Sequence, residues 1–345
     1  MQRLLFRVIT AAACGAFACA ALATNLWYED NNMGSAGGMP ADFAEKFSHP
    51  ESFERAAKFI DVYMMRLKVF KDMDDRFIRD VFYAYLKKQN IKLALNVGGG
   101  TLAQAANRTN IAGDEVALLQ RLKKLGVQVD YFSMQSALDK APKVDGKKQH
   151  YPLNKRVDDI VAYAKAIHAI YPAAEIGIID SSPSHNFEYR EPYKQVKAAL
   201  AREGIALSYI QLDISFDIPR ESRGGVTWQK LRQLEAFVED DLGAKFGYFA
   251  TSRKGGHTSS QAFHERVMAT LQCYHAAGGS PREFVIASWF PHPEKTVPDT
   301  ATGDDYPAMR TVLEFGRELK RLDQGGAAAA PQSTGRRGGK SACAR

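Results

Sequence analysis

The fold is decided by residues 175–215, which read EIGIIDSSPSHNFEYREPYKQVKAALAREGIALSYIQLDIS. Two short apolar runs, 175–180 and 207–215, have the length and the branched side chains of buried strands. Between them, residues 191–202 carry a helical pattern, and Gly204 follows in the position of a left-handed helix stop. A strand, a helix and a second strand in this order predict two parallel strands joined by a right-handed crossover.

The same unit recurs along the chain. Strand-like runs are expected at Leu26–Asp30, Val62–Val69, Lys92–Val97, Val129–Gln135, Glu175–Asp180, Leu207–Ser215, Lys245–Thr251 and Phe284–Phe290. Helical patterns are expected at Ser52–Ile60, Asp74–Lys88, Asp114–Leu125, Lys155–Ile170, Glu191–Arg202, Trp228–Leu242, Ser260–Ala276 and Ala308–Leu322. Several connections after strands are long, whereas those after helices are short. Eight such units predict an α/β fold of one domain, the (β/α)8 or TIM barrel.

An open doubly wound sheet is the alternative architecture. Such a sheet usually carries a glycine-rich phosphate-binding turn after its first strand. The glycine cluster of this chain, residues 98–100, follows the third strand-like run and lacks both the G-x-G-x-x-G spacing and the P-loop lysine. We therefore expect the closed barrel and no nucleotide site.

The two ends of the chain differ in composition from its middle. Residues 1–23 hold Arg3 and Arg7, then an apolar stretch and a small-x-small cleavage pattern, and predict a cleaved signal peptide. The apolar stretch is about 15 residues, short of the roughly 20 that span a bilayer. Residues 324–345 are rich in Gly, Ala and Arg and predict a disordered basic tail. The barrel is expected at 24–323, exported to the periplasm or secreted, without a stable membrane span.

The net charge of the barrel region argues against a nucleic-acid partner. The whole chain carries +7, but the two ends supply +6 of it and residues 24–323 only +1. A nucleic-acid protein is expected to carry its basic charge on the folded body. Cys273 falls in a helical pattern and is expected to pack, while Cys343 lies in the tail, so no disulfide framework is expected. Nothing in the sequence indicates an oligomeric state.

Polar side chains alternate with apolar ones in several expected strands. In the sixth strand the apolar set suits the helix layer, so Gln211 and Asp213 are expected to point into the barrel. By the same alternation Asn96 and Gln135 point inward near the ends of the third and fourth strands, and Lys68 extends the polar face of the second. Burying such groups without partners is costly. Their convergence predicts a polar binding site, with an internal hydrogen-bond network as the alternative.

Three acids at strand ends are the catalytic candidates. Asp180 ends the fifth strand, Asp213 lies near the end of the sixth, and Glu29 lies near the end of the first. Since adjacent strands are about 5 Å apart, Asp180 and Asp213 are expected within roughly 5–8 Å, which suits the paired carboxyls of glycoside hydrolysis. Repulsion between them raises one pKa, and that group can act as the acid. Structural ion pairs with Arg66, Lys68 or Arg253 are the alternative.

Aromatic and histidine side chains also fall at the expected mouth of the barrel. Trp289 ends the eighth strand and Trp27 lies in the first, which neighbours it in a closed barrel. Their rings suit stacking on sugar rings, although tryptophan often packs in cores. His185 and His257 lie in mouth loops and are expected to bind substrate. Histidines and acids together could hold zinc or manganese, but no spaced pair such as H-x-H or H-E-x-x-H occurs. We expect no metal and no other cofactor.

With these features the chain resembles the secreted glycoside hydrolases built on (β/α)8 barrels. The residues that carry the resemblance are the strand-eight pair Ser288-Trp289 and the polar or acidic strand ends. The largest clan of those enzymes has catalytic glutamates at the ends of strands four and seven. Here those ends read 134–136 Met-Gln-Ser and 250–252 Ala-Thr-Ser, so no glutamate can be carried over.

The expected function is therefore an exported carbohydrate-active enzyme, leaning to glycoside hydrolysis, that acts on a poly- or oligosaccharide with two carboxylates. Asn96, Gln135, Lys68 and Arg253 would bind hydroxyls or acidic groups, and these cations make an acidic polysaccharide one option. A non-catalytic glycan-binding barrel of the cell envelope explains the missing glutamates as well. A metal-dependent lyase or isomerase is the third interpretation, because this fold hosts many chemistries.

Overall fold

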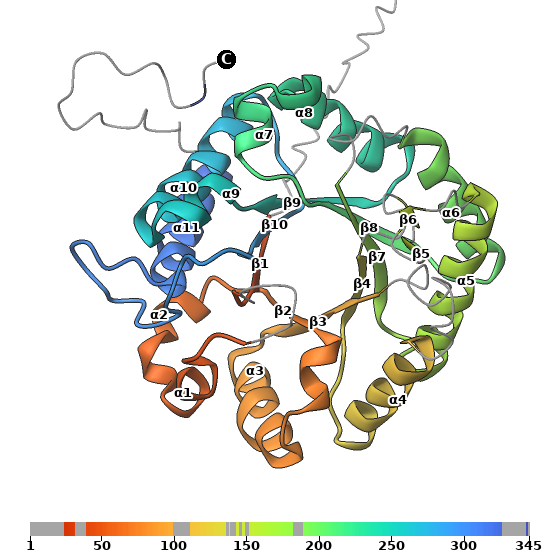
Figure 1. The fold of residues 1–345 in the computed structure, drawn as a ribbon, viewed down its shortest axis with the longest axis horizontal. Coiled ribbons are helices and arrows are strands. Elements are labelled where there is room, and N and C mark those ends of the chain that lie inside the picture. The colour runs from red at the N-terminus through yellow and green to blue at the C-terminus, as the bar shows by residue number, and fades with distance from the viewer. Residues whose placement is uncertain are drawn as a thin grey trace, which may run out of the picture.

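Eight parallel strands close into a barrel in the computed structural model of the chain (Figure 1). The structure describes residues 24–31, 39–98, 111–135, 138, 143–144, 147–148, 152–181, 189–325 and 343. The barrel strands are β1 (Asn25–Glu29), β2 (Val62–Arg66), β3 (Lys92–Val97), β4 (Tyr131–Gln135), β7 (Glu175–Asp180), β8 (Leu207–Leu212), β9 (Lys245–Ala250) and β10 (Glu283–Ile286). They neighbour one another in the order β1-β10-β9-β8-β7-β4-β3-β2, and β2 closes onto β1. The single-domain TIM barrel is thus confirmed.

Helices surround the barrel between successive strands (Figure 1). The α-helices are α1 (Phe43–Ser48), α2 (Glu54–Ala57), α3 (Ala84–Gln89), α4 (Ile111–Lys124), α5 (Leu153–Ile170), α6 (Arg190–Arg202), α7 (Asp217–Arg220), α8 (Trp228–Ala236), α9 (Arg253–Thr258), α10 (Ser260–Ala276) and α11 (Ala308–Asp323). Short 3₁₀ segments are η1 (Pro50–Ser52), η2 (Leu67–Lys71) and η4 (Arg223–Gly225), and π-helical turns are η3 (Phe77–Tyr83) and η5 (Phe237–Asp241). A small hairpin, β5 (Lys143–Val144) with β6 (Lys147–Lys148), precedes α5. Gly204 after α6 has a φ of 72°, the left-handed stop expected from the sequence.

Alternation along the strands divides the buried side chains into two cores. The larger core lies between the barrel and the helices, and the smaller one fills the barrel. Inside the barrel the ring of Trp27 packs 4.8 Å from that of Tyr131 and 5.5 Å from that of Tyr209. Gly177 makes room for this layer, because a Cβ there would lie 2.2 Å from the Tyr209 ring. Residues without side chains thus admit large aromatic rings to the barrel axis.

A chain of hydrogen bonds crosses the barrel interior. Tyr209 and Ser133 share one at 2.9 Å, Ser133 donates to the Gln211 amide oxygen at 3.4 Å, and the Gln211 amide donates to Glu283 at 2.8 Å. Gly247 admits the Gln211 side chain, since a Cβ there would lie 2.6 Å from Gln211 Cγ. Burial raises the pKa of Glu283 to about 7, against the hydrogen bond from Gln211. The inward orientation of Gln211 is confirmed, but the side chain serves this internal network.

A disulfide joins Cys273 in α10 to Cys343 near the C-terminus. The expectation that the mature chain lacks disulfides is therefore wrong. Cys273 is buried, as expected for a packed side chain. A bond between residues so far apart in the sequence leaves no local signal, because only the folded path of the chain brings them together. Among the described residues, no helix is both long and apolar enough to cross a bilayer.

Candidate active site

The strongest candidate acid is Glu29, the last residue of β1. It pairs in register with Met64 of the barrel interior and is 2% exposed. Burial raises the pKa of Glu29 to about 7; the charge of Arg66 opposes the shift, and those of Asp213 and Asp30 add to it. The Arg66 guanidinium forms an ion pair with the Glu29 carboxylate at 3.6 Å. Glu29 is therefore a carboxyl that can hold a proton near neutral pH.

Asp213 is the second acid of this end of the barrel. It follows β8, and its backbone N–H donates to the carbonyl of Asp180 at 2.8 Å, which extends the ladder by one residue. Leu212 and Ile214 on either side of it pack in the outer core, so alternation turns Asp213 inward. Its side chain is half-buried, and its charge acts on the pKa of Glu29. The structure thus associates Asp213 with Glu29.

Asp180 lies on the other side of the barrel wall. It pairs in register with Leu212, whose side chain faces the helices, and it is 1% exposed. Its carboxylate accepts hydrogen bonds from the backbone N–H of Ser181 at 3.0 Å and from the Tyr193 hydroxyl of α6 at 3.2 Å. The expected pairing of the Asp180 and Asp213 carboxyls is therefore wrong. The reason is pleating: neighbouring backbones carry these two side chains on opposite faces.

Cations and amides line the same end of the barrel as Glu29. Arg66 ends β2 and is opposite Asn96 of β3 in register; Asn96 is 5% exposed. Lys68 lies in η2, just after β2, and is exposed. Partial burial and the charge of Arg66 lower the pKa of Lys68. Gln135 ends β4 and is half-buried. These positions agree with the expected inward set, except that Lys68 has left the strand.

The two tryptophans have different surroundings. Trp289 follows β10, is half-buried, and packs on Phe249 of the inner core with ring centroids 5.6 Å apart. Trp27 is 0% exposed and packs against the rings of Tyr131 and Tyr209, so it cannot stack on a sugar. The expectation of sugar contact is therefore wrong for Trp27, which is a core residue. Trp289 remains a candidate for stacking on a sugar ring.

No hydrogen bond or ion pair among the described residues links the two predicted histidines or Gln211 to Glu29 and Asp213. His257 in α9 is exposed and packs on Phe290 at 5.1 Å between rings. His185 lies outside the described residues. Gln211 is 0% exposed in the internal network, so a substrate contact is excluded for it. Within the described ranges, no group of three or more His, Cys, Asp or Glu side chains is placed to hold a metal ion.

A buried charge cluster stands directly behind Glu29. Asp30 turns to the helix side, where Lys46 of α1 forms an ion pair with it at 2.6 Å. The hydroxyls of Tyr28 and Tyr63 donate to the same carboxylate, and Lys46 also donates to Tyr63. Lys46 is 0% exposed among aromatic rings that include Phe47, and burial lowers its pKa. This cluster fixes the end of β1 and so the position of Glu29. Lys46 lies in no recognisable sequence pattern and was not among the predicted site residues.

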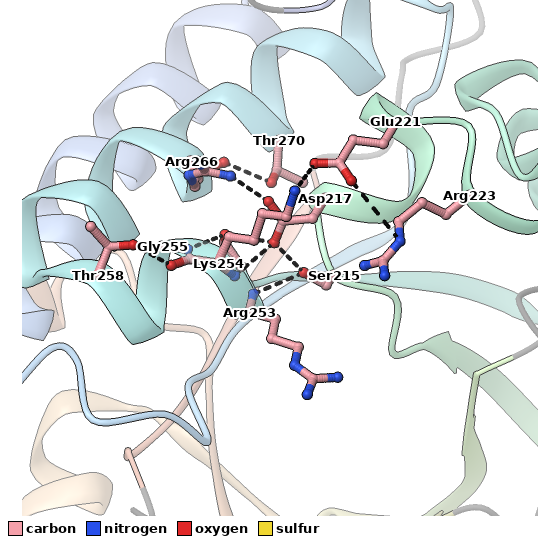
Figure 2. Close-up of polar contacts among 11 residues, drawn as sticks. Ser215, Asp217, Glu221, Arg223, Arg253, Lys254, Gly255, Thr258, Arg266 and Thr270 are labelled. Atoms are coloured by element: carbon pink, nitrogen blue, oxygen red, sulfur yellow. Dashed lines mark hydrogen bonds and ion pairs between the residues drawn. The ribbon is translucent and has the colours of Figure 1, made fainter.

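Asp217 organises the loops that follow β8 and β9 (Figure 2). Its buried carboxylate accepts hydrogen bonds from Ser215 at 2.9 Å, from Ser252 at 3.0 Å and from the backbone N–H of Lys254 at 2.9 Å, and it pairs with Arg266. Burial pushes the pKa of Asp217 upward, but these hydrogen bonds and the Arg266 charge outweigh it and the pKa is lowered. Asp217 is thus a structural anion that ties the two loops together.

Solved structures share this architecture. Native xylanase 10B from Thermotoga maritima matches with a TM-score of 0.53 and 13% identity over 88% of this chain and 97% of that chain. A putative alpha-L-fucosidase from Bacteroides thetaiotaomicron matches with a TM-score of 0.53 and 12% identity over 87% and 96%. A thermostable xylanase mutant from Cellvibrio japonicus gives 0.51 and 11% over 85% and 97%. At these identities the likeness shows the barrel fold.

No protein-family model matches the chain, and no curated protein matches its sequence. The resemblance to barrel glycoside hydrolases therefore holds at the level of architecture, while the residues of the site rest on the geometry described above.

Proposed function

We propose that this chain is an exported carbohydrate-active enzyme that hydrolyses glycosidic bonds with Glu29 and Asp213. The observation that carries the proposal is Glu29 itself: a carboxyl buried at the carboxyl end of a barrel strand, with its pKa raised to about 7, in the field of a second acid. Active sites of this fold lie at that end of the barrel. The likeness to xylanases and a fucosidase supports the reaction class.

Glu29 takes the role of general acid. Protonated near neutral pH, it gives its proton to the glycosidic oxygen as the bond to the anomeric carbon breaks. The Arg66 guanidinium at 3.6 Å then faces the carboxylate that remains. Arg66 thus stabilises the product state of the proton transfer, and burial stabilises the reactant state.

Asp213 takes the complementary role. Its charge faces the positive charge that develops on the sugar ring, where a carboxylate acts either as nucleophile or as the base that activates water. In this proposal Asn96 and Gln135 bind hydroxyls of the sugar, and the half-buried ring of Trp289 offers a stacking face. Water supplies the OH and H that complete hydrolysis in either mechanism.

Export is supported by two features. Residues 1–23 have the pattern of a cleaved signal peptide. The Cys273–Cys343 disulfide is of the kind that persists in oxidising compartments such as the periplasm.

The experiment is a hydrolysis screen of the mature protein on neutral and acidic oligosaccharides, with release of reducing ends as the readout. Glu29→Gln and Asp213→Asn are each expected to lower turnover by about 10²–10⁴-fold. Asp180→Asn is the matched control and is expected to retain turnover. Loss of turnover in Asp180→Asn with full turnover in Glu29→Gln would contradict the assignment. Glycan binding without turnover in the wild-type protein would favour the non-catalytic barrel.

A further inference from the structure

We infer that the carboxyl end of the barrel recognises an anionic oligosaccharide, whose acidic groups are bound by Arg253 on one side of Trp289 and Glu29 and by Arg66 and Lys68 on the other. This rests on the proposed function and adds the substrate class to it. The inference follows from the order of the strands. β9, β10, β1 and β2 are successive neighbours, so the residues that follow or end them form one arc.

Arg253 is held by its backbone and presents its side chain. Its N–H donates to Ser215 Oγ at 2.9 Å, and the next N–H, that of Lys254, donates to the buried Asp217 carboxylate. Figure 2 shows the Arg253 guanidinium extending away from this cluster. The side chain is exposed, and its guanidinium forms no hydrogen bond or ion pair with any described residue. Asp217 thus fixes the base of an arginine whose tip is open to a ligand.

The cations on the other side repel each other. The Arg66 charge acts on Lys68 and disfavours its protonated form, so an anion bound between them is stabilised by both. Glu29 does not neutralise Arg66 fully, because burial favours its protonated form near neutral pH. The arc thus carries three cationic side chains, those of Arg253, Arg66 and Lys68.

Buried polar atoms beside the arc lack partners. Thr251 follows β9 on the inward side and is 1% exposed, yet its hydroxyl bonds to no described residue. The indole N–H of Trp289 is buried and has no acceptor among them either. Burying such groups is costly unless a ligand or solvent satisfies them. The two unpartnered donors mark the wall beside the arc as polar, and an anionic ring bound along the arc supplies an acidic group to the Arg253 guanidinium.

The test is calorimetric binding of three hexasaccharides to mature Glu29→Gln protein, which keeps the ligand intact. Hexagalacturonate carries carboxylates, sulfated xylohexaose carries sulfates, and xylohexaose is neutral. At least one anionic ligand is expected to bind about tenfold or more tightly than xylohexaose, in line with a charge-assisted hydrogen bond. The preferred one identifies the acidic group. Its affinity is expected to fall as salt rises.

A second set of variants assigns the preference to the arc. When Arg253→Ala is added to Glu29→Gln, the affinity for the anionic ligand is expected to fall by about tenfold, and the affinity for xylohexaose is expected to stay the same. Lys68→Ala is expected to act in the same direction. Arg202→Ala is the control, because it removes an exposed arginine from the outer wall. It should change the affinity for neither ligand. Equal affinities for all three ligands, no binding at all, or an equal loss of both ligand types in Arg253→Ala would overturn the inference.

The two proposals fail separately. If the wild-type protein hydrolyses only neutral glycans, the anionic recognition is wrong and the hydrolase stands. If Arg253-dependent binding of an anionic ligand is found without turnover of that ligand, recognition stands and hydrolysis is wrong.

Discussion

Glu29 and Asp30 are adjacent acids with opposite environments. Asp30 faces the helices, where Lys46 and two tyrosine hydroxyls bind its carboxylate. Glu29 faces the barrel interior, where Arg66 stays 3.6 Å away and the pKa is raised to about 7. Strand alternation thus places two different carboxyls on consecutive residues. That of Asp30 is bound by several partners on the helix side, and that of Glu29 can take up a proton on the interior side. The difference shows how a barrel wall can hold a protonatable carboxyl in place: the adjacent residue, which faces the helices, forms the buried ion pair that anchors the strand end.

Removing the anchor is expected to have the largest effect. Lys46→Met leaves the Asp30 carboxylate buried without its counter-charge, and breaking one side of a buried pair costs about 3–5 kcal/mol of unfolding free energy. Urea denaturation at pH 7 measures it. The double variant Lys46→Met/Asp30→Asn is expected to recover part of the loss. A loss below about 1 kcal/mol in the single variant would mean that the cluster does not hold the wall together.

Replacing Glu29 is expected to raise the free energy of unfolding, in contrast to the loss in Lys46→Met, and only at high pH. The folded pKa of about 7 lies above the ordinary 4.5, so the folded state binds more protons than the unfolded state between these values, and stability falls as pH rises through this range. Glu29→Gln removes that loss. The variant should be more stable than wild type by on the order of 3 kcal/mol at pH 8 and equal to it below about pH 4.5. Denaturation midpoints of both proteins across this range measure the difference. A variant that is less stable at every pH would show that Glu29 is a satisfied structural residue.

The smallest expected effect separates the two tryptophans. Trp289→Ala removes a half-buried stacking face and should weaken binding of the preferred hexasaccharide by about three- to tenfold, the range of one aromatic contact. Trp27→Phe keeps an aromatic ring in the inner core and should leave that affinity unchanged while lowering stability. Titration of both variants provides the comparison. An affinity loss confined to Trp27→Phe would reverse the assignment.

The barrel could be predicted from the sequence because its signals are local and repeated. Each strand-like run lies within a few residues of an observed strand, and Gly204 ends its helix as expected. Inward Gln211 and Asn96 could also be predicted, since polar residues alternate with apolar ones in their strands.

The arrangement of the candidate site could be predicted only in part. In residues 175–180 both faces of the strand are apolar, as is usual for parallel strands buried on two sides, so the pattern could not show that Asp180 faces the helices. For the same reason the sequence pattern could not show that Trp27 is buried. Glu29 was among the candidates, but its environment depends on Arg66 and Asp213 from other strands. Lys46 and the Cys273–Cys343 bond depend wholly on tertiary contacts.

The most direct test of Glu29 as the protonatable acid of the barrel is its pKa. Carbon-13 NMR of the side-chain carboxyl, assigned by the resonance that disappears in Glu29→Gln, follows its titration in the free protein. A midpoint near pH 7 is expected in the wild-type protein, and a lower one in Asp213→Asn because a negative charge is removed. A midpoint at or below 4.5 in the wild-type protein would contradict it, because Glu29 would then be an ordinary ionised partner of Arg66.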